Sequence, residues 1–365
     1  MSFDDDPALV GLTGFYAWGA GEVGRKVGRA LILGGHAFLG FIDSDPARWG
    51  QTLPEGRIFA PDAVRDPGPD VACIVSIWHY RHSFPETAAR ARALGFRTVL
   101  HFSRAATGLG LAGVLPNYCI DQPQATFGGD GPALLAAARG ALADPASRAV
   151  FDSILAFRRR PDPQHAPPPD PVWPFDPARI VGLIDVGACI GEFCREALAD
   201  FPALSTITAY EPDPQNYRRL IGDGLDRIPR LAFHPRNAAV SARSGALRFR
   251  SGGGWGSHIA PDGDVTVAAV ALDEERLDLT GPTLLKMDIE GAEMSALRGM
   301  TALLASEFLI AMVTIEHRAE DLFEIPQILA RRTNCSLFLR ARDAEICMDT
   351  CYISVPDGLL AAATP

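Results

Sequence analysis

Two carboxylates at the end of an apolar segment are the residues of this chain best suited to chemistry. The segment Leu284-Leu-Lys-Met-Asp-Ile-Glu-Gly-Ala-Glu293 starts apolar, places Asp288 and Glu290 before a glycine, and leads into a helical pattern. This is typical of a buried parallel strand, and ligands of open α/β sheets bind beyond the carboxyl ends of such strands. The pair therefore indicates acid–base or cofactor chemistry. The same side chains could instead satisfy the first amides of the helix, typically worth ~1 kcal/mol for a cap.

His317 is a third candidate for proton transfer. It follows the next predicted strand, in Thr314-Ile-Glu-His317, and the ends of neighbouring parallel strands meet at one edge. Asp288, Glu290 and His317 are therefore the predicted catalytic residues. An Asp, Glu and His set could also hold a divalent cation that acidifies a hydroxyl. No tight ligand spacing demands one, so no metal is predicted, and His317 could also be an ordinary surface imidazole.

A second strand-to-turn segment indicates a nucleoside site. Ile180 to Gly191 is predicted to be a strand ending at Asp185, then a turn carrying Gly187, with a helix from about Glu192; the next strand ends at Glu211. Glycines let the backbone pass close under a ligand, and an acid on the next strand can accept both ribose hydroxyls. The Asp-x-Gly-x-x-x-Gly turn lacks the spacing that seats a pyrophosphate. A nucleoside without phosphates fits better, which indicates S-adenosyl-L-methionine (SAM).

Four motifs in order resemble the FkbM-type methyltransferases. They are Asp185-Val-Gly-Ala-x-x-Gly191, Tyr210-Glu-Pro212, Asn237-Ala-Ala-Val-Ser241 and Leu285-Lys-Met-Asp-Ile-Glu-Gly-Ala-Glu293, and the resemblance covers roughly residues 130 to 355. It implies a class I SAM-dependent enzyme. Most FkbM-type enzymes O-methylate sugars or polyketide hydroxyls. The expected acceptor is a small-molecule hydroxyl, that of a saccharide or nucleotide-sugar.

The resemblance also implies roles for individual residues. Glu211 would bind the ribose, the turn after Asp185 would shape the methionine end, and Asn237 would lie near the adenine. The full set of implied cofactor-binding residues is Asp185, Gly187, Ala188, Gly191, Glu211, Pro212, Asn237, Ala238 and Asp288.

The elements that must position these residues form a predicted α/β sheet. Strands are expected near residues 180–186, 205–211, 231–236, 283–288 and 308–315, followed by a hairpin of 336–342 and 350–355. Seven strands ending in a hairpin match the class I methyltransferase sheet, in which the last strand is antiparallel. An insertion at 245–271 carries a glycine-rich stretch, Ser251 to His258, that could close over a substrate.

The N-terminal region is predicted to be a separate, smaller Rossmann-like α/β unit of four strands. Gly19-Ala-Gly-Glu-Val-Gly24, with Asp43 farther on, is a dinucleotide fingerprint. One alternative is therefore an NAD(P)-dependent oxidoreductase, although the second half of a dinucleotide fold and a hydride-transfer partner are missing. The unit also resembles the domain appended to some sugar C-methyltransferases, which seats the nucleotide part of a substrate or is structural. A non-catalytic nucleotide-sugar-binding protein is a further alternative.

Length, proline content and charge indicate how the whole chain is organised. The 365 residues are divided into a docking domain at 1–105, a helical connector at 106–178 with eight prolines between 160 and 177, and a methyltransferase domain at 179–365. The net charge of -10 argues against nucleic acid as a partner. No apolar stretch approaches the ~20 residues that insert into a membrane, and the acidic start does not resemble a signal peptide. A cytoplasmic location is therefore expected; the sequence predicts neither the acceptor's identity nor the oligomeric state.

Overall fold

The chain folds into two compact units. The computed structural model describes residues 7–77, 82–111, 114, 127–159, 165, 173–252, 257–277, 279–341 and 350–361. Most of the predicted proline-rich connector and the centre of the glycine-rich stretch, 253–256, lie outside these residues. The predicted domain boundaries at 105 and 178 stay predictions.

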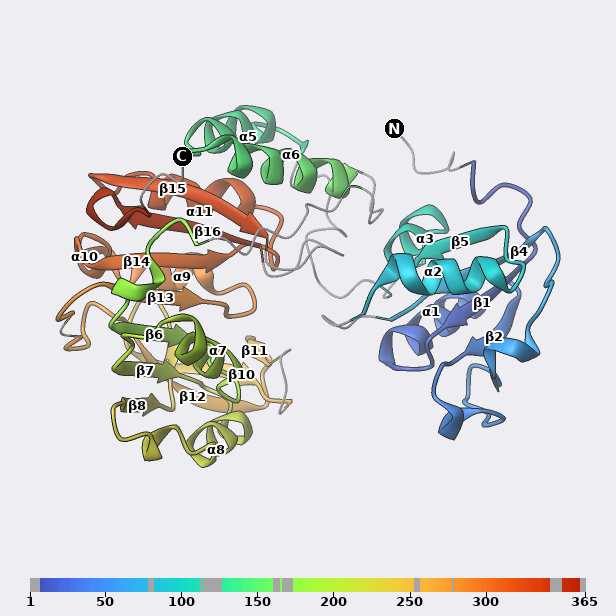
Figure 1. Cartoon of the computed structure of the whole chain (residues 1–365), viewed down its shortest axis with the longest axis horizontal. Helices are drawn as coiled ribbons and strands as arrows, with labels where there is room; N and C mark the ends of the chain where they lie inside the picture. The colour runs from blue at the N-terminus through green and yellow to red at the C-terminus, as the bar shows by residue number, and fades with distance from the viewer. Residues whose placement is uncertain are drawn as a thin grey trace. The chain divides into compact units, whose positions relative to one another are not determined.

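The first unit contains a five-stranded parallel sheet (Figure 1). Its strand order is β3-β2-β1-β4-β5, and every pairing is parallel. The strands are β1 (Gly14–Trp18), β2 (Phe38–Ile42), β3 (Ile58–Phe59), β4 (Val71–Val75) and β5 (Thr98–His101), and the helices are α1 (Glu22–Leu33), α2 (Phe84–Ala93) and α3 (Phe102–Gly108). The predicted Rossmann-like unit is therefore present. The prediction of four strands was wrong by one, because β3 has two residues and is too short to give a pattern.

The second unit contains a sheet of seven strands in the order β15-β16-β14-β13-β6-β7-β8. The strands are β6 (Gly182–Val186), β7 (Thr206–Tyr210), β8 (Ala232–Arg236), β13 (Thr283–Met287), β14 (Leu309–Thr314), β15 (Cys335–Ala341) and β16 (Thr350–Pro356). β16 is antiparallel to both of its neighbours, and the other pairs are parallel. The expected class I arrangement, with the last strand reversed, is confirmed.

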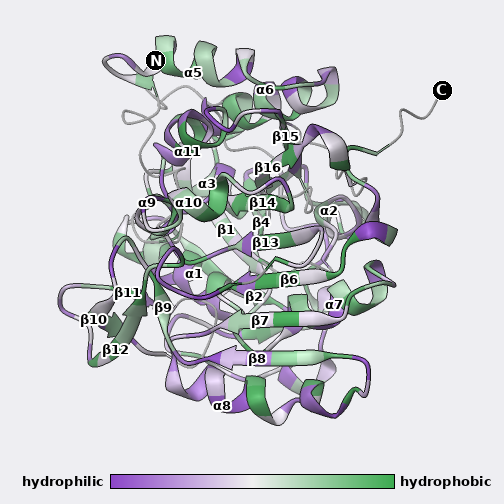
Figure 2. Ribbon diagram, turned by 90° about the vertical axis from the view of Figure 1, so that its left-hand side faces the viewer, coloured by the Kyte–Doolittle hydropathy of each residue, from purple (hydrophilic) through white to green (hydrophobic). Residues whose placement is uncertain are grey.

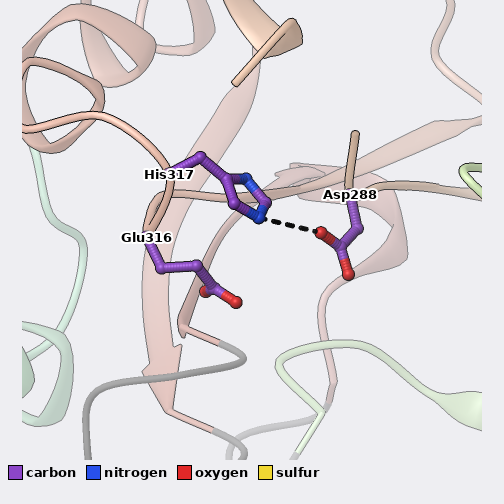
Figure 3. Close-up of side chains that lie close together, drawn as sticks. All are labelled: Asp288, Glu316 and His317. Atoms are coloured by element: carbon purple, nitrogen blue, oxygen red, sulfur yellow. Dashed lines mark ion pairs between the residues drawn. The ribbon is translucent and has the colours of Figure 1, made fainter. Parts of the chain in front are cut away.

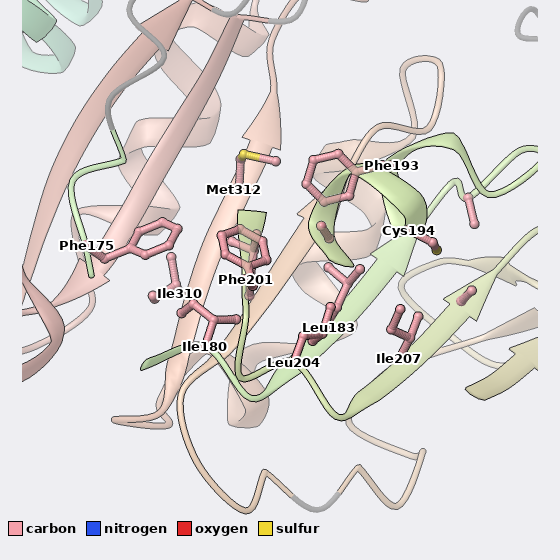
Figure 4. Close-up of a cluster of buried hydrophobic side chains, with 14 of the residues drawn as sticks. Phe175, Ile180, Leu183, Phe193, Cys194, Phe201, Leu204, Ile207, Ile310 and Met312 are labelled. Carbon is pink, nitrogen blue, oxygen red and sulfur yellow. The ribbon is translucent and has the colours of Figure 1, made fainter. Parts of the chain in front are cut away.

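The central strands are buried on both faces. Every residue of β6, β13 and β14 is buried, as expected for parallel strands covered by helices on both sides. Figure 2 shows hydrophobic colour on β6 and β7 and a more hydrophilic β8 at the sheet edge. The covering helices are α7 (Glu192–Asp200), α8 (Pro214–Gly222), α9 (Glu293–Arg298), α10 (Thr301–Leu304) and α11 (Asp321–Leu329). In Figure 4, Leu183, Phe193 and Ile310 belong to the core on one face.

A small sheet occupies the predicted insertion. Its order is β11-β10-β12-β9, from β9 (Ala239–Val240), β10 (Gly245–Arg250), β11 (His258–Ile259) and β12 (Val265–Val270). The hydroxyls of Ser251 and Ser257 donate to Asp213 Oδ2 at 2.8 and 2.9 Å. The other oxygen of Asp213 accepts the N–H groups of Gln215 and Asn216 and so caps α8. One carboxylate therefore holds the start of α8 and both ends of the glycine-rich stretch.

Two helices precede the seven-stranded sheet in the sequence, α5 (Gly131–Gly140) and α6 (Pro145–Arg159). Arg340 of β15 pairs with Asp144 at 2.7 Å and donates to the Ser147 hydroxyl at 2.7 Å. The same hydroxyl accepts the Leu339 N–H at 3.0 Å. These contacts fix the start of α6 on the edge strand. Among the described residues, no helix has both the length and the apolar character needed to cross a membrane.

Candidate active site

The loops that follow β6 and β13 press against each other at the carboxyl edge of the sheet. The strands are in register with Val186 opposite Met287, so both loops begin at the same level. Gly187 has a φ of +83°, and a Cβ added there would lie 1.9 Å from the carbonyl oxygen of Asp288. Glycine is therefore required at this position both by its backbone conformation and by the close approach.

Both of these loops also contain a non-glycine residue in the left-handed region. Cys189 has a φ of 48° and Glu290 a φ of 54°. Such conformations cost of order 1–3 kcal/mol and persist where the surrounding structure imposes them, which is frequent at functional sites. The two turns that were singled out in the sequence are thus the places where this edge of the sheet stores backbone strain.

Glu211 follows β7 and is buried beside the first of these turns. Its two oxygens accept the N–H groups of Cys189 at 2.8 Å and Asp213 at 2.7 Å. Burial raises the pKa of Glu211 to about 7, against the lowering effect of these hydrogen bonds. Because a carboxylate has about four acceptor positions, each oxygen can accept one further hydrogen bond.

The residues after β7 and β8 hold the backbone around Glu211 in place. The Asn237 side chain donates to the carbonyl oxygens of Glu211 at 2.7 Å and Pro212 at 3.2 Å. Ala238 and Ala188 are both buried. The N–H of Ala188 is bound to the Tyr210 carbonyl, and Gly191, with a φ of +85°, precedes α7. All of these predicted cofactor-binding residues thus lie at the carboxyl ends of β6, β7 and β8.

Lys286 is a charged residue inside the otherwise apolar strand β13. Its ammonium group donates to the Gly187 carbonyl at 3.0 Å and lies 3.5 Å from Asp185 Oδ1 and 3.7 Å from Asp288 Oδ2. Asp185 is fully buried and also accepts from the Cys194 thiol at 3.2 Å. Lys286 therefore supplies positive charge between two acidic residues and ties β13 to the first glycine turn.

His317 is packed among carboxylates. Its side chain is 6% exposed, and Nδ1 lies 2.8 Å from Glu293 Oε1, to which it must donate because a carboxylate only accepts. Nε2 lies 3.5 Å from Asp288 Oδ1 and 3.7 Å from Glu290 Oε2. Burial alone would lower the pKa of His317, but the hydrogen bond to Glu293 and the surrounding carboxylates raise it well above its usual value. The alternative of an ordinary surface imidazole is wrong.

Asp288 and Glu290 differ in their electrostatic surroundings. Burial would raise the pKa of Asp288, but the charges of Lys286 and His317 hold it below its usual value. Burial, with the charges of Asp288 and Glu293, raises the pKa of Glu290 to about 7 against the effect of His317. The alternative of helix caps receives no support, because α9 has Ala292 at its cap position with no side-chain cap bond. The structure thus brings all three predicted catalytic residues together, and Figure 3 shows two of them, Asp288 and His317.

Sequence reasoning missed two residues of this site. Lys286 could have been found from its position, since a lysine within an apolar strand is rarely buried without a partner. Glu293 lies in the first turn of α9, and it accepts the Ile289 N–H at 3.0 Å and the Nδ1–H of His317. Nothing in the sequence indicates that pairing with a residue 24 positions away.

The fingerprint of the first unit adopts the expected turn. Gly19 has a φ of +105°, and a Cβ at Gly24 would lie 1.8 Å from the Gly19 carbonyl oxygen. Asp43 accepts the N–H groups of Ala20 at 3.0 Å and Asp45 at 2.9 Å, and lies 3.3 Å from Arg48. Several of its acceptor positions are thus used within the chain itself, and NAD(P) binding by this unit stays a prediction.

The fold and a family comparison agree on what the second unit is similar to. The seven-stranded order with a reversed last strand is that of a class I methyltransferase. Residues 185–335 match the family model for the methyltransferase FkbM domain. Residues 185–335 of the second unit are thus similar to an FkbM methyltransferase domain, and they lie on a sheet with the class I strand order.

Two known proteins are similar to the chain. The hexuronic acid methyltransferase AglP of Haloferax volcanii is 29% identical over 154 residues, which are 40% of this chain and 61% of that protein. The crystal structure of methyltransferase FkbM from Methylobacillus flagellatus superposes with a TM-score of 0.71 at 19% identity, over 96% of this chain and 95% of that one. At that identity the likeness shows the fold alone. The chain therefore aligns with about three fifths of its curated relative and shares its fold with the solved structure over almost its full length.

Proposed function

We propose that the chain is a SAM-dependent O-methyltransferase that transfers a methyl group to a hydroxyl of a saccharide, nucleotide-sugar or related small molecule. The observation that carries the proposal is the position of Glu211, a buried carboxylate beside the glycine turn after β6, at the sheet edge where Asp288 and Glu290 also lie. The name of the Haloferax relative, a hexuronic acid methyltransferase, supports a saccharide as the acceptor.

The residues fit a nucleoside donor. Each oxygen of Glu211 can accept one more hydrogen bond, so the two ribose hydroxyls could both donate to it. Gly187 and Gly191 keep the turn free of side chains, and Asp185 with Lys286 would set the charge at the methionine end. Asn237 would keep the Glu211–Pro212 backbone in place near the adenine.

The chain's own residues would then position the acceptor and remove its proton. When bound, SAM supplies an electrophilic methyl group for in-line displacement by an oxygen. Holding the reactants in line can contribute ~7–11 kcal/mol, and a general base adds ~10²–10⁴-fold in rate. Asp288 and Glu290, each with a side chain a little over one quarter exposed, can reach a bound hydroxyl. His317 would hold these two carboxylates in place.

Ligand-dependent thermal stability tests the proposal. A ligand that binds only the folded chain, at 100 times its dissociation constant, adds ~2.7 kcal/mol. We expect S-adenosylhomocysteine to raise the melting temperature and Glu211→Ala to abolish that shift. Asp43→Ala, an acid of the first unit, is the matched control and should leave the shift unchanged. Stabilisation by NAD without any by S-adenosylhomocysteine would overturn the proposal in favour of an oxidoreductase.

The pH dependence of donor binding follows from the pKa of Glu211. Ribose hydroxyls donate to the ionised carboxylate, so binding competes with a proton at every pH below about 7. We expect the dissociation constant of S-adenosylhomocysteine, measured by calorimetry, to be about tenfold larger at pH 6 than at pH 8. Glu211→Gln should bind weakly and show no such dependence. An unchanged wild-type affinity across this range would show that Glu211 does not receive the ribose.

A further inference from the structure

A set of metal-ligating side chains lies where β13 and β14 end. Asp288, Glu316 and His317 each offer one ligand atom, and these atoms all lie within 4.8 Å of one another. Figure 3 shows the His317 ring pointing towards Asp288, with Glu316 on the adjoining position of the same loop. Two carboxylates and an imidazole are ligand types that first-row divalent cations accept.

The second nitrogen of His317 is an independent indication of a cation. A histidine that binds a metal almost always donates its other ring N–H to a carboxylate, a backbone carbonyl or water, which fixes the orientation of the ring. His317 Nδ1 makes this bond to Glu293 at 2.8 Å, and Glu293 is fully buried. Glu293 is itself held by the Ile289 N–H at 3.0 Å. The ring is therefore locked with Nε2 directed at Asp288 and Glu290.

The distances around Nε2 suit a shared ion better than a direct hydrogen bond. Nε2 lies 3.5 Å from Asp288 Oδ1, whereas charge-assisted N–H···O bonds measure ~2.7–2.9 Å. Two atoms that are each ~2.0–2.2 Å from one cation are at most ~4.4 Å apart, when they lie on opposite sides of it. Asp288 and His317 meet this limit as they stand, and the 4.8 Å bound on the full set requires at most a small contraction.

We propose that Asp288, Glu316 and His317 bind one divalent cation of the first transition row, and that this cation receives the acceptor hydroxyl. The second half of this inference rests on the proposed function. A bound cation polarises an oxygen and makes its proton easier to remove. Glu290, 3.7 Å from Nε2 and outside the ligand set, then accepts that proton. A saccharide diol or carboxylate could supply two oxygen ligands at once.

Direct Mn²⁺ binding to the full chain tests the site without any methyl donor or acceptor. We expect electron paramagnetic resonance titration of free Mn²⁺ to give one site per chain. Glu316→Gln and His317→Gln should each weaken binding at least tenfold, and Glu293→Gln, which releases the ring, by about 10–100-fold. Glu320→Gln is the matched control: it removes a nearby negative charge that contacts Arg318 at 3.6 Å, and should leave binding unchanged.

The outcomes separate this inference from the proposed function. Absence of Mn²⁺ binding up to about 1 mM, with S-adenosylhomocysteine still stabilising the chain, would overturn the cation site alone. Binding that Glu320→Gln weakens as much as Glu316→Gln would show general attraction to acidic side chains, which also overturns it. Melting temperatures without Mn²⁺ identify any variant that fails to fold, and Asp288→Asn then replaces it in the comparison.

Discussion

Replacing Glu290 by glutamine is expected to lower kcat for methyl transfer by about 10²–10⁴-fold, the range supplied by a positioned general base. The glutamine keeps the size of the side chain and the left-handed backbone, which has a φ of 54°, but it cannot take up a proton. The affinity for S-adenosylhomocysteine should stay the same, because Glu290 lies on the loop after β13 and not beside Glu211. Single-turnover methyl transfer from labelled SAM to candidate saccharides measures the rate, and calorimetry measures the affinity.

Two comparisons make this result specific. Glu320→Gln removes a carboxylate from the region after β14 without touching His317, and should keep kcat within about twofold. Mn²⁺ binding should also survive in Glu290→Gln, since this side chain is not among the proposed ligands. A Glu290→Gln enzyme with full activity would show that another group, or the solvent, takes the acceptor proton.

Replacing Gly187 by alanine is expected to destabilise the second unit by about 3 kcal/mol or more. A left-handed backbone alone costs an alanine roughly 1–2 kcal/mol. At Gly187 the new Cβ would also lie 1.9 Å from the carbonyl oxygen of Asp288, so the loops after β6 and β13 must separate. Urea unfolding, followed by the fluorescence of a tryptophan such as Trp173 beside the core of this unit, measures the loss.

Gly224→Ala provides the matched control. Gly224 has nearly the same φ, +87°, but its added Cβ would meet nothing closer than Arg227 Cδ at 4.0 Å. This variant should lose the backbone cost of roughly 1–2 kcal/mol and nothing more. The difference between the two variants isolates the contact between the loops. Equal losses would contradict the close approach of Gly187 to Asp288.

The sequence predicted the strands of the second unit well because their signals are local. β6, β13 and β14 are short, mostly apolar runs followed by polar residues or glycine, and all seven strands lie within a few residues of the expected positions. Parallel pairing then brings Gly187 and Asp288 to one edge without any further information. β3 was missed because a strand of two residues carries no periodicity.

The interactions within the site were harder to predict because they depend on packing. Asp288, Glu290 and His317 were identified from their places after strands, but the buried partner of His317 is a helical acid with no distinguishing pattern. The protonation of these groups depends on burial and on neighbours across the loops, which no local sequence window contains. For Lys286, the sequence shows a lysine within an apolar strand. It does not show that this side chain donates to the Gly187 carbonyl.

Asp213 connects the start of α8 to the glycine-rich stretch of the insertion. Its carboxylate anchors Ser251 and Ser257, the two residues that flank positions 252–256, and it stands two residues after Glu211. Because the same carboxylate caps α8, a substitution of either serine is expected to disturb the start of that helix as well.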